Sequence, residues 1–340
     1  MAAAMPEETF RSYSKQQART YARFRQDYSP ALYDSILSFH TSSGGQDTLL
    51  LDVGCGPGNV TRALASHFER AVGLDASPAM VLQAEEQSRD AGACTKTGAA
   101  PRFHQSSAEA LGAALDGDDA VRDGSVDLIT VANAAHWFDM PAFWRAAGRA
   151  LRPRGTVAVW ISGEGVVHPS TPGAAALDAL LQRFIARDLL PHYLPGNLLF
   201  RDRYRGLPLP WTVVPPVPGF VEAAFERREW DLAARDAPSP PPTLLTFGTA
   251  GGGGGGGGGD DGDEPVGLDT VEAALSTMSP VTRWRAAHPE RVGTERDVVR
   301  MLRRDMEAVL RSHGVRQGEE RVRMIMDGTL LLFKKSDTSV

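Results

Sequence analysis

The sequence predicts an α/β fold, a Rossmann-like, doubly wound and mostly parallel sheet, and three observations support this prediction. An apolar run at 48–51 meets Asp52 and then three alternate glycines between 54 and 58, which is typical of a buried strand that turns tightly into a helix. A second apolar stretch, at 71–74, ends in Asp75. Strand-like and helix-like patterns then alternate through the first half of the chain, as parallel strands with right-handed crossovers require.

The remaining strands follow in order. Residues 101–105 predict a weak third strand, 125–131 a clear fourth and 156–160 a fifth. Near the end of the chain, 323–326 and 329–333 are apolar stretches separated by Asp327-Gly328, so a closing antiparallel hairpin is expected there.

The same patterns predict the organisation of the chain around this sheet. Residues 1–47 are expected to form an N-terminal helical lid of two helices with a break at Ser29-Pro30, since the residue before proline avoids the helical region. The predicted segments after the lid are a core at 48–160, a substrate-side insertion with a late strand at 161–235, a disordered insertion at 236–267, and closing helices and strands of the same domain at 268–340. The third of these contains nine consecutive glycines, a composition that buries too little apolar surface to order itself.

Composition excludes several classes of function. The chain has 340 residues, of which 42% are hydrophobic, and a formal charge of −6, which argues against a nucleic-acid partner. Cys55 and Cys94 lack the number and spacing of a disulfide framework or a metal site. The sequence shows neither a leader-like apolar segment nor a long apolar span, so no membrane partner and a cytoplasmic location are expected.

The glycine loop is the candidate ligand site. Glycine adopts positive φ at little cost and lets backbone amides approach a ligand closely. Asn59 stands where the dinucleotide fingerprint needs its third glycine, and the loop lacks the Lys-Ser/Thr pair of a phosphate-binding loop. An anion at Asp52 repels a pyrophosphate but suits a ligand with an ammonium and a sulfonium group. The alternative is a turn that binds no ligand. Asp75 stands where such folds place a carboxylate on the ribose hydroxyls, which favours a ligand.

With these residues in place, the chain resembles a class I S-adenosylmethionine-dependent methyltransferase, and most closely the fungal branch that includes trans-aconitate and cantharidin methyltransferases. The resemblance rests on Tyr21-Ala22-Arg23-Phe24-Arg25 with Tyr28, Asp52-Val53-Gly54-Cys55-Gly56-Pro57-Gly58-Asn59, Gly73-Leu74-Asp75-Ala76-Ser77-Pro78, Ala134-Ala135-His136-Trp137-Phe138-Asp139 and Leu151-Arg152-Pro153-Arg154-Gly155. Two positions depart from the family: Gln26 follows Arg25 where the family usually has proline, and Ser107 replaces the usual acid that contacts the adenine amino group.

The resemblance implies S-adenosylmethionine as the cofactor, a small-molecule substrate and no metal. Position by position, it implies that Asp52, Gly54, Gly56 and Gly58 bind the methionine part, that Asp75 holds the ribose, that Ser107 and Ala108 flank the adenine, and that Asn133 touches the methionine end. The expected acceptor is an oxygen of a fungal-type metabolite, a carboxylate or a hydroxyl, in secondary metabolism.

The chemistry of the acceptor decides which side chains are needed. A carboxylate needs no general base, and arginines would position it, with Arg25 the first candidate and Arg23 the second. A hydroxyl or amine needs a base, for which His136 is the best placed. The alternative for His136 is packing beside Trp137. Tyr21 is the third catalytic candidate, since it could shape the acceptor pocket or bond the cofactor carboxylate, against an alternative of packing within the lid.

Two other functions remain open at this stage. One is a nicotinamide-dependent oxidoreductase on a similar sheet, which the missing third glycine disfavours. The other is a non-catalytic S-adenosylmethionine-binding regulator that recruits a protein partner. The sequence gives no signal for an oligomeric state, because no heptad or exposed apolar repeat stands out.

Overall fold

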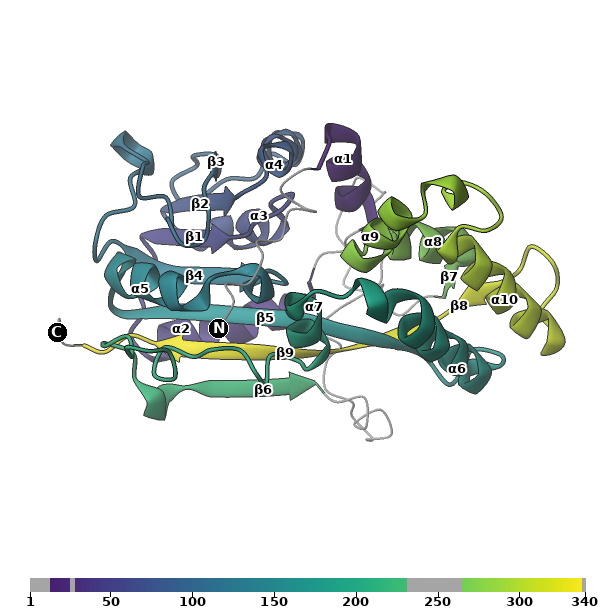
Figure 1. The fold of residues 1–340 in the computed structure, drawn as a ribbon. Helices are drawn as coiled ribbons and strands as arrows, with labels where there is room; N and C mark the ends of the chain where they lie inside the picture. Colours follow the sequence, from purple (N-terminus) through teal and green to yellow (C-terminus); the bar gives the residue numbers. More distant parts are fainter. Residues whose placement is uncertain (1–12, 25–27, 231–264, 338–340) are drawn as a thin grey trace.

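The computed structural model describes residues 13–24, 28–230 and 265–337. Its centre is a seven-stranded sheet of strand order β3-β2-β1-β4-β5-β9-β6 (Figure 1). The strands are β1 Leu49–Val53, β2 Arg70–Asp75, β3 Arg102–Gln105, β4 Val126–Ala132, β5 Leu151–Val167, β6 Glu226–Trp230 and β9 Met324–Lys334, with β7 Val266–Gly267 and β8 Arg321–Val322 paired separately. The helices are α1 Lys15–Phe24, α2 Pro30–Ser42, α3 Asn59–Ala65, α4 Pro78–Asp90, α5 Met140–Ala150, α6 Ala174–Phe184, α7 Pro195–Arg201, α8 Leu268–Ser276, α9 Ser279–Ala287 and α10 Val298–Ser312.

The sheet confirms the predicted fold class. Strands β1 to β5 pair in parallel, and β9 pairs antiparallel with both β5 and β6 at the closing edge. The turn expected at Asp327-Gly328 is wrong, because β9 runs straight through these residues. The extended strand β5 supplies backbone partners on both sides of the expected turn, since Ile161 pairs with Thr329 and Gly165 with Met326. Pairing with a long neighbouring strand overrides the local turn preference.

Alternate residues of the strands fill two cores on opposite faces of the sheet, as the period of a strand requires. On one face, Leu50, Leu128 and Trp160 pack against α2 and α3. On the other face, residues such as Ile129 and Val159 pack against α5 and the segment 199–225. The sheet is therefore buried on both sides, which explains its near-continuous apolar strands.

Beyond the ends of the other strands, β5 and β9 extend to a group of helices that has its own core (Figure 1). This core is formed by α6, α8, α9 and α10 together with Val167 and Val322. In α10 the buried residues recur at helical spacing and form one apolar face: Val298, Val299, Leu302, Met306 and Leu310. The molecule thus consists of a sheet domain and a helical extension joined through two long strands.

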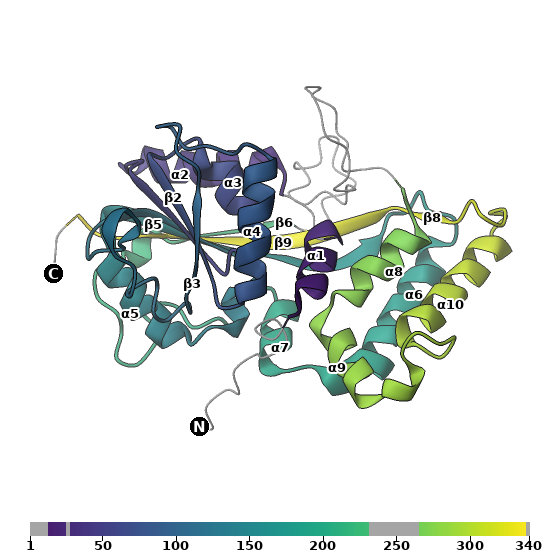
Figure 2. The ribbon, with the colours of Figure 1, turned by 90° about the horizontal axis from the view of Figure 1, so that it is seen from above.

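The N-terminal helices occupy different places. The predicted break is present: Ser29 is extended, with φ −64° and ψ 147°, and Pro30 opens α2. Helix α1 lies between α4 and α8, at the boundary of the sheet domain and the helical extension (Figure 2). Helix α2 packs on the sheet through Leu32, Ile36 and Phe39 instead of lying over a cleft, because these residues give it an apolar face. Only α1 has the position expected of a lid.

Other differences concern the second half of the chain. Helices α7 and α9 were not expected, and both begin at or beside a proline in a stretch without strong periodicity. Most of the predicted disordered insertion, residues 236–264, lies outside the described residues. Its last residues correct the expected boundary, since Val266 and Gly267 form β7 and pair with β8. Across the described part of the chain, the helices are too short or too polar to cross a membrane.

Candidate active site

Two adjoining cavities lie at the carboxyl ends of the parallel strands. They share Tyr21, Gly54, Gly56, Ala132 and Asn133, and so form one cleft. The smaller cavity, of 120 Å³, lies over the ends of β1, β2 and β4, and the larger one, of 280 Å³, extends to α6, α8 and α10. Ligands of open α/β sheets bind at this edge, where strand order reverses.

The glycine loop forms the wall between the two cavities. Gly54, Gly56 and Gly58 all have positive φ, of 70°, 52° and 81°. A Cβ on Gly58 would lie 2.8 Å from the Phe103 ring, whereas one on Gly56 would meet no described atom within 4 Å. The side of the backbone where a Cβ would stand at position 56 therefore faces open space, which is the geometry expected of a loop that a ligand approaches.

Asp75 ends β2 and lines the smaller cavity. Its Oδ2 accepts a hydrogen bond from the Gly56 amide at 2.9 Å, and its Oδ1 accepts one from the Ser77 amide at 2.8 Å. Ser77 in turn caps α4. A carboxylate has about four acceptor positions, so one that is fixed by two amides retains capacity for two ribose hydroxyls. Asp75 thus joins the loop to the predicted ribose position.

Asp52 does not line either cavity, which differs from the expected contact with the methionine part. The residue is fully buried behind the loop, where its carboxylate accepts hydrogen bonds from Thr61 Oγ1 at 2.7 Å and Thr130 Oγ1 at 2.9 Å. Burial raises the pKa of Asp52 to about 6. Through these two hydrogen bonds Asp52 connects α3 and β4 to β1, the strand that precedes the glycine loop.

The side of the smaller cavity that was expected to bind adenine is formed by Met80, Ser106, Ala108 and Glu109. The predicted Ala108 is therefore in place, whereas Ser107 is not a lining residue and its hydroxyl accepts from the Ala110 amide. Glu109 is an acid that sequence reasoning missed. It lies two positions after the serine that replaces the family's acid, and its Oε1 accepts from the Asp139 amide at 3.0 Å.

Asn133 stands at the junction of the two cavities, in the left-handed region with φ 51°. Its Nδ2 donates to the Tyr28 hydroxyl at 2.9 Å. Its Oδ1 accepts from the Ser162 amide at 2.8 Å and from the Ser162 hydroxyl at 3.1 Å. This network fixes the side chain that was expected at the methionine end, and it adds Tyr28 and Ser162 to the wall of the larger cavity.

The predicted catalytic candidates, Arg23 included, have different outcomes. Tyr21 lines both cavities from α1. Arg25 lies outside the described residues, and the side chain of Arg23 is not described. His136 lines neither cavity: its Nδ1 forms a 2.8 Å hydrogen bond with the Tyr204 hydroxyl, and its ring lies 4.5 Å from that of Trp137. This geometry favours the packing alternative for His136.

The larger cavity has mainly apolar walls. They include Leu181, Phe184 and Ile185 from α6 and its continuation, and Val271, Ala274 and Leu275 from α8. Four methionines from three segments complete them: Met278, Met306, Met324 and Met326. None of the described residues that line this cavity carries a charge. The sequence contained no motif for this wall, because its members come from α6, α8, α10 and β9 and meet only in three dimensions.

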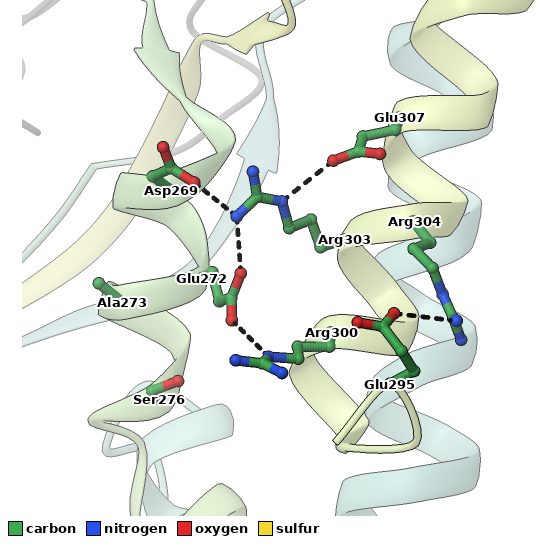
Figure 3. A pocket seen from close by; sticks show the side chains of 9 residues that line it. All are labelled: Asp269, Glu272, Ala273, Ser276, Glu295, Arg300, Arg303, Arg304 and Glu307. Carbon is green, nitrogen blue, oxygen red and sulfur yellow. Dashed lines mark hydrogen bonds and ion pairs between the residues drawn. The ribbon is translucent and has the colours of Figure 1, made fainter. Parts of the chain in front are cut away.

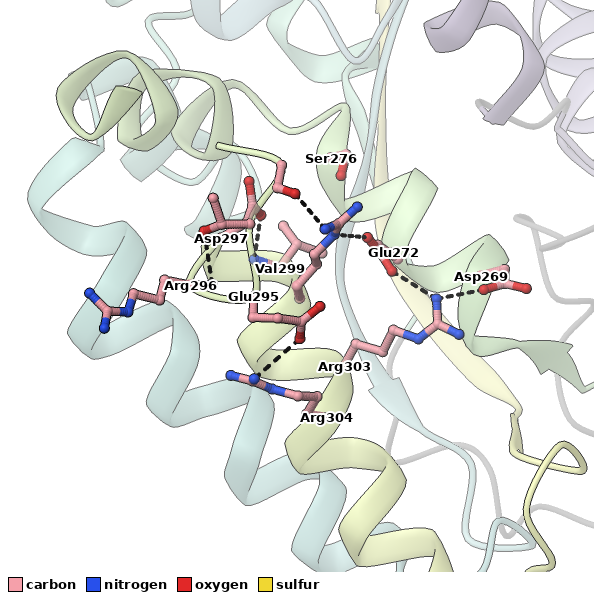
Figure 4. A network of polar contacts seen from close by, with 12 residues as sticks. Asp269, Glu272, Ser276, Glu295, Arg296, Asp297, Val299, Arg303 and Arg304 are labelled. Atoms are coloured by element: carbon pink, nitrogen blue, oxygen red, sulfur yellow. Dashed lines mark hydrogen bonds and ion pairs between the residues drawn. The ribbon is translucent and has the colours of Figure 1, made fainter. Parts of the chain in front are cut away.

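A third hollow, between α8 and α10, is open and polar, with a volume of 790 Å³ (Figure 3). Its charged side chains pair with one another: Arg303 contacts Asp269 at 2.5 Å, Glu272 at 2.8 Å and Glu307 at 3.0 Å. At the start of α10, Asp297 accepts from the Val299 amide (Figure 4). These contacts hold the two helices together, and we assign the hollow no ligand. Within the described ranges, no cluster of three or more metal-binding side chains occurs.

Comparison with known proteins adds independent information. Residues 51–159 match the family model described as a methyltransferase domain. The probable S-adenosylmethionine-dependent methyltransferase CRG1 of Saccharomyces cerevisiae is 28% identical over 195 residues, which cover 57% of this chain and 60% of that protein. The methyltransferase cfoB of Aspergillus candidus is 33% identical over 158 residues, 46% of each chain. The matches thus span about half of the length of these curated relatives.

A solved structure agrees with the fold of nearly the whole chain. It is that of a type II methyltransferase candidate from Anaeromyxobacter dehalogenans, with a TM-score of 0.54 and 22% identity. The superposition covers 91% of this chain and 97% of the other. At this level of identity the likeness supports the fold, and the functional assignment rests on the matched domain.

Proposed function

We propose that the chain is an S-adenosylmethionine-dependent methyltransferase that methylates an oxygen of a small molecule, since residues 51–159 match a methyltransferase domain and a relative named as a probable S-adenosylmethionine-dependent methyltransferase is similar over 57% of the chain. The observation that carries the proposal is the two-part cleft. Its smaller cavity contains Asp75 and the glycine loop, and its larger cavity begins at Asn133 and is apolar. Such a cleft suits a cofactor and an acceptor that meet at the shared wall.

The residues present fit the cofactor. In this proposal the open backbone of Gly54 and Gly56 lies against the methionine part, with Gly58 shaping the turn, Asp75 binds the ribose, and Ala108 lies against the adenine. Asp52 acts from behind the loop through Thr61 and Thr130. Ser107 is proposed to act through its backbone, because its hydroxyl is used within its own turn.

Bound S-adenosylmethionine supplies a methyl group on a sulfonium, which an acceptor oxygen takes with its lone pair as the carbon–sulfur bond breaks and S-adenosylhomocysteine is left. The protein has then mainly to align the acceptor and exclude water. Tyr21 and Asn133 are the residues that we propose for alignment, since both line the junction of the cavities. Arg25 remains a candidate for holding an acidic acceptor. His136 is proposed as a positioning residue that acts through Tyr204.

Isothermal titration with S-adenosylhomocysteine tests the proposal. We expect binding to the wild type and a loss of about 100-fold in affinity for Asp75→Ala, because a charged acceptor of ribose hydroxyls is removed. Asp75→Asn keeps the shape and removes only the charge, so it should fall between the two. Asp90→Ala, an exposed acid at the end of α4, is the matched control and should bind as the wild type does.

The outcomes separate the alternatives. A wild type that binds NADH in place of S-adenosylhomocysteine would revive the oxidoreductase. A wild type that binds S-adenosylhomocysteine, yet turns over no acceptor in a broad screen with labelled S-adenosylmethionine while it captures a protein partner, would favour the regulator. Absence of binding of either ligand would overturn the methyltransferase proposal.

A further inference from the structure

We infer that the acceptor is a largely apolar molecule with a single acidic oxygen; the inference rests on the proposed function and names its substrate class. The first observation is the composition of the larger cavity. Its walls beyond Asn133 are formed mainly by aliphatic, aromatic and thioether side chains of α6, α8, α10 and β9, together with the hydroxyls of Thr270 and Thr277. An acceptor gains affinity there by burying apolar surface.

The second observation is the absence of charge. None of the described residues around the larger cavity is a Lys, Arg, His, Asp or Glu. A buried charge without a partner is costly, so each carboxylate of a polycarboxylic acid would need a cation, and the described residues of these walls provide none. One negative charge is different, because the positive sulfonium of the bound cofactor can compensate it at the shared wall. The described walls therefore favour an acceptor with one negative charge over small polycarboxylic acids, although one such acid is a named substrate of the branch that the sequence resembles.

The third observation concerns the proton. An oxygen must lose its proton to become a good acceptor, and the described walls of the larger cavity contain no histidine, carboxylate or lysine that could take it. The Cys55 thiol lines the cavity, but its burial raises its pKa, which keeps it protonated. The acceptor oxygen must consequently be acidic enough to ionise in solution, as a carboxylic acid or an acidic phenol does.

The methionines indicate how the apolar body is accommodated. Met324 and Met326 lie on the same face of β9, and a Cβ on Gly165 would lie 2.6 Å from the Met326 sulfur. Glycine at this position thus makes room for the thioether. Since methionine side chains are flexible and polarisable, the cavity should accept apolar bodies of several shapes.

The test is calorimetry on the full chain with 2-naphthoate, its methyl ester and trans-aconitate as probes. The protein is first saturated with S-adenosylhomocysteine or with sinefungin, which carries an ammonium group in place of the sulfonium. We expect 2-naphthoate to bind the sinefungin complex about tenfold more tightly than it binds the S-adenosylhomocysteine complex, and about tenfold more tightly than trans-aconitate binds. The ester should show no preference between the two complexes.

A matched pair of variants locates the probe. Met326→Glu places a negative charge in the cavity wall and should lower the affinity for 2-naphthoate by about tenfold. Met301→Glu, on α10 but away from the cavity, should leave this affinity unchanged. Affinity for S-adenosylhomocysteine should stay within about twofold in both, which shows that they are folded. Tighter binding of trans-aconitate than of 2-naphthoate, or equal binding to both Glu variants, would overturn the inference and leave the proposed function standing. A wild type that does not bind S-adenosylhomocysteine would overturn both.

Discussion

The two cavities of the cleft are built in different ways. The smaller cavity depends on backbone groups close together in sequence, with the amides of Gly56 and Ser77 fixed on Asp75. The larger cavity depends on side chains from distant elements, such as Phe184 of α6 and Met326 of β9. The first arrangement requires particular residues at fixed spacing, whereas the second requires only apolar side chains that fill a shape.

This difference indicates which wall of the cleft tolerates substitution and which does not. A change of one residue in the glycine loop alters φ, ψ and the positions of amides, so the cofactor wall tolerates little change. A change in the wall of the larger cavity alters shape by a few methyl groups, which flexible methionines can absorb. Substrate preference can therefore diverge on this fold while cofactor binding is retained. The predictions that follow test the two walls in turn.

The largest effect is expected for Gly58→Ala. The left-handed backbone, with φ 81°, costs an L residue about 1–2 kcal/mol. The new Cβ would also lie 2.8 Å from the Phe103 ring and 3.1 Å from the Ala84 methyl, and such overpacking costs about 1–3 kcal/mol more. We expect the free energy of unfolding, measured by urea denaturation, to fall by about 4 kcal/mol.

Gly98→Ala is the matched control, because Gly98 also has φ 81° but a Cβ there would meet no described atom within 4 Å. It should lose only the conformational cost, about 1–2 kcal/mol. Equal losses in the two variants would show that the contacts with Phe103 and Ala84 do not constrain the loop.

The second prediction concerns pH and Asp52. Burial raises the pKa of this carboxyl from 3.8 to about 6, so between these values the folded chain holds a proton that the unfolded chain has released. The contribution of Asp52 to stability is thus complete below pH 3.8 and is lost as the pH rises through 6. The loss amounts to about 3 kcal/mol. We expect the difference in unfolding free energy between wild type and Asp52→Asn to fall by this amount across that window.

Because the measured quantity is the difference in unfolding free energy between wild type and Asp52→Asn, groups that titrate in both proteins cancel. His40, whose pKa burial lowers to about 4, titrates in both and cancels. Met306→Leu, a change in the wall of the larger cavity, should alter stability by the same amount at every pH. A flat difference for Asp52→Asn would mean that this acid titrates alike in the folded and unfolded chains.

The sequence predicted the smaller cavity better than the larger one. The sheet, the loop and the place of Asp75 in the cleft were predicted because a strand, a glycine turn and an acid lie within a short segment, where spacing fixes geometry, whereas Asn133 was named from the resemblance alone. Asp52 was assigned to the ligand because sequence shows that an acid is present but not which hydroxyls it faces. The turn at Asp327-Gly328 was wrong because its local preference is overridden by pairing with β5. The methionine wall was missed because its members are distant in sequence.

A smaller effect is expected at His136, which lines neither cavity and is hydrogen-bonded to Tyr204. If the histidine acts by positioning, His136→Ala and Tyr204→Phe remove the same 2.8 Å hydrogen bond, and their effects on stability should overlap. We expect a coupling energy of about 1 kcal/mol in a double-mutant cycle, with affinity for S-adenosylhomocysteine unchanged. A loss of turnover for His136→Ala that Tyr204→Phe does not reproduce, together with a changed pH profile, would instead assign His136 a role in proton transfer.

The smallest effect is expected at the ion pairs that hold α8 to α10, outside the larger cavity. Arg303 contacts three carboxylates, of which Asp269 is 87% exposed, so solvent screens much of the attraction. Arg303→Met should lower the unfolding free energy by about 1 kcal/mol, and the loss should shrink in about 1 M NaCl. Arg304→Met, which removes a single exposed pair with Glu295, is the control and should lose less than about 0.5 kcal/mol.

The Arg303 variant also tests whether the two walls are independent. Because α8 and α10 line the larger cavity only, Arg303→Met should lower the affinity for an apolar acceptor and not the affinity for S-adenosylhomocysteine. Equal weakening of both ligands would mean that the two walls of the cleft are mechanically coupled.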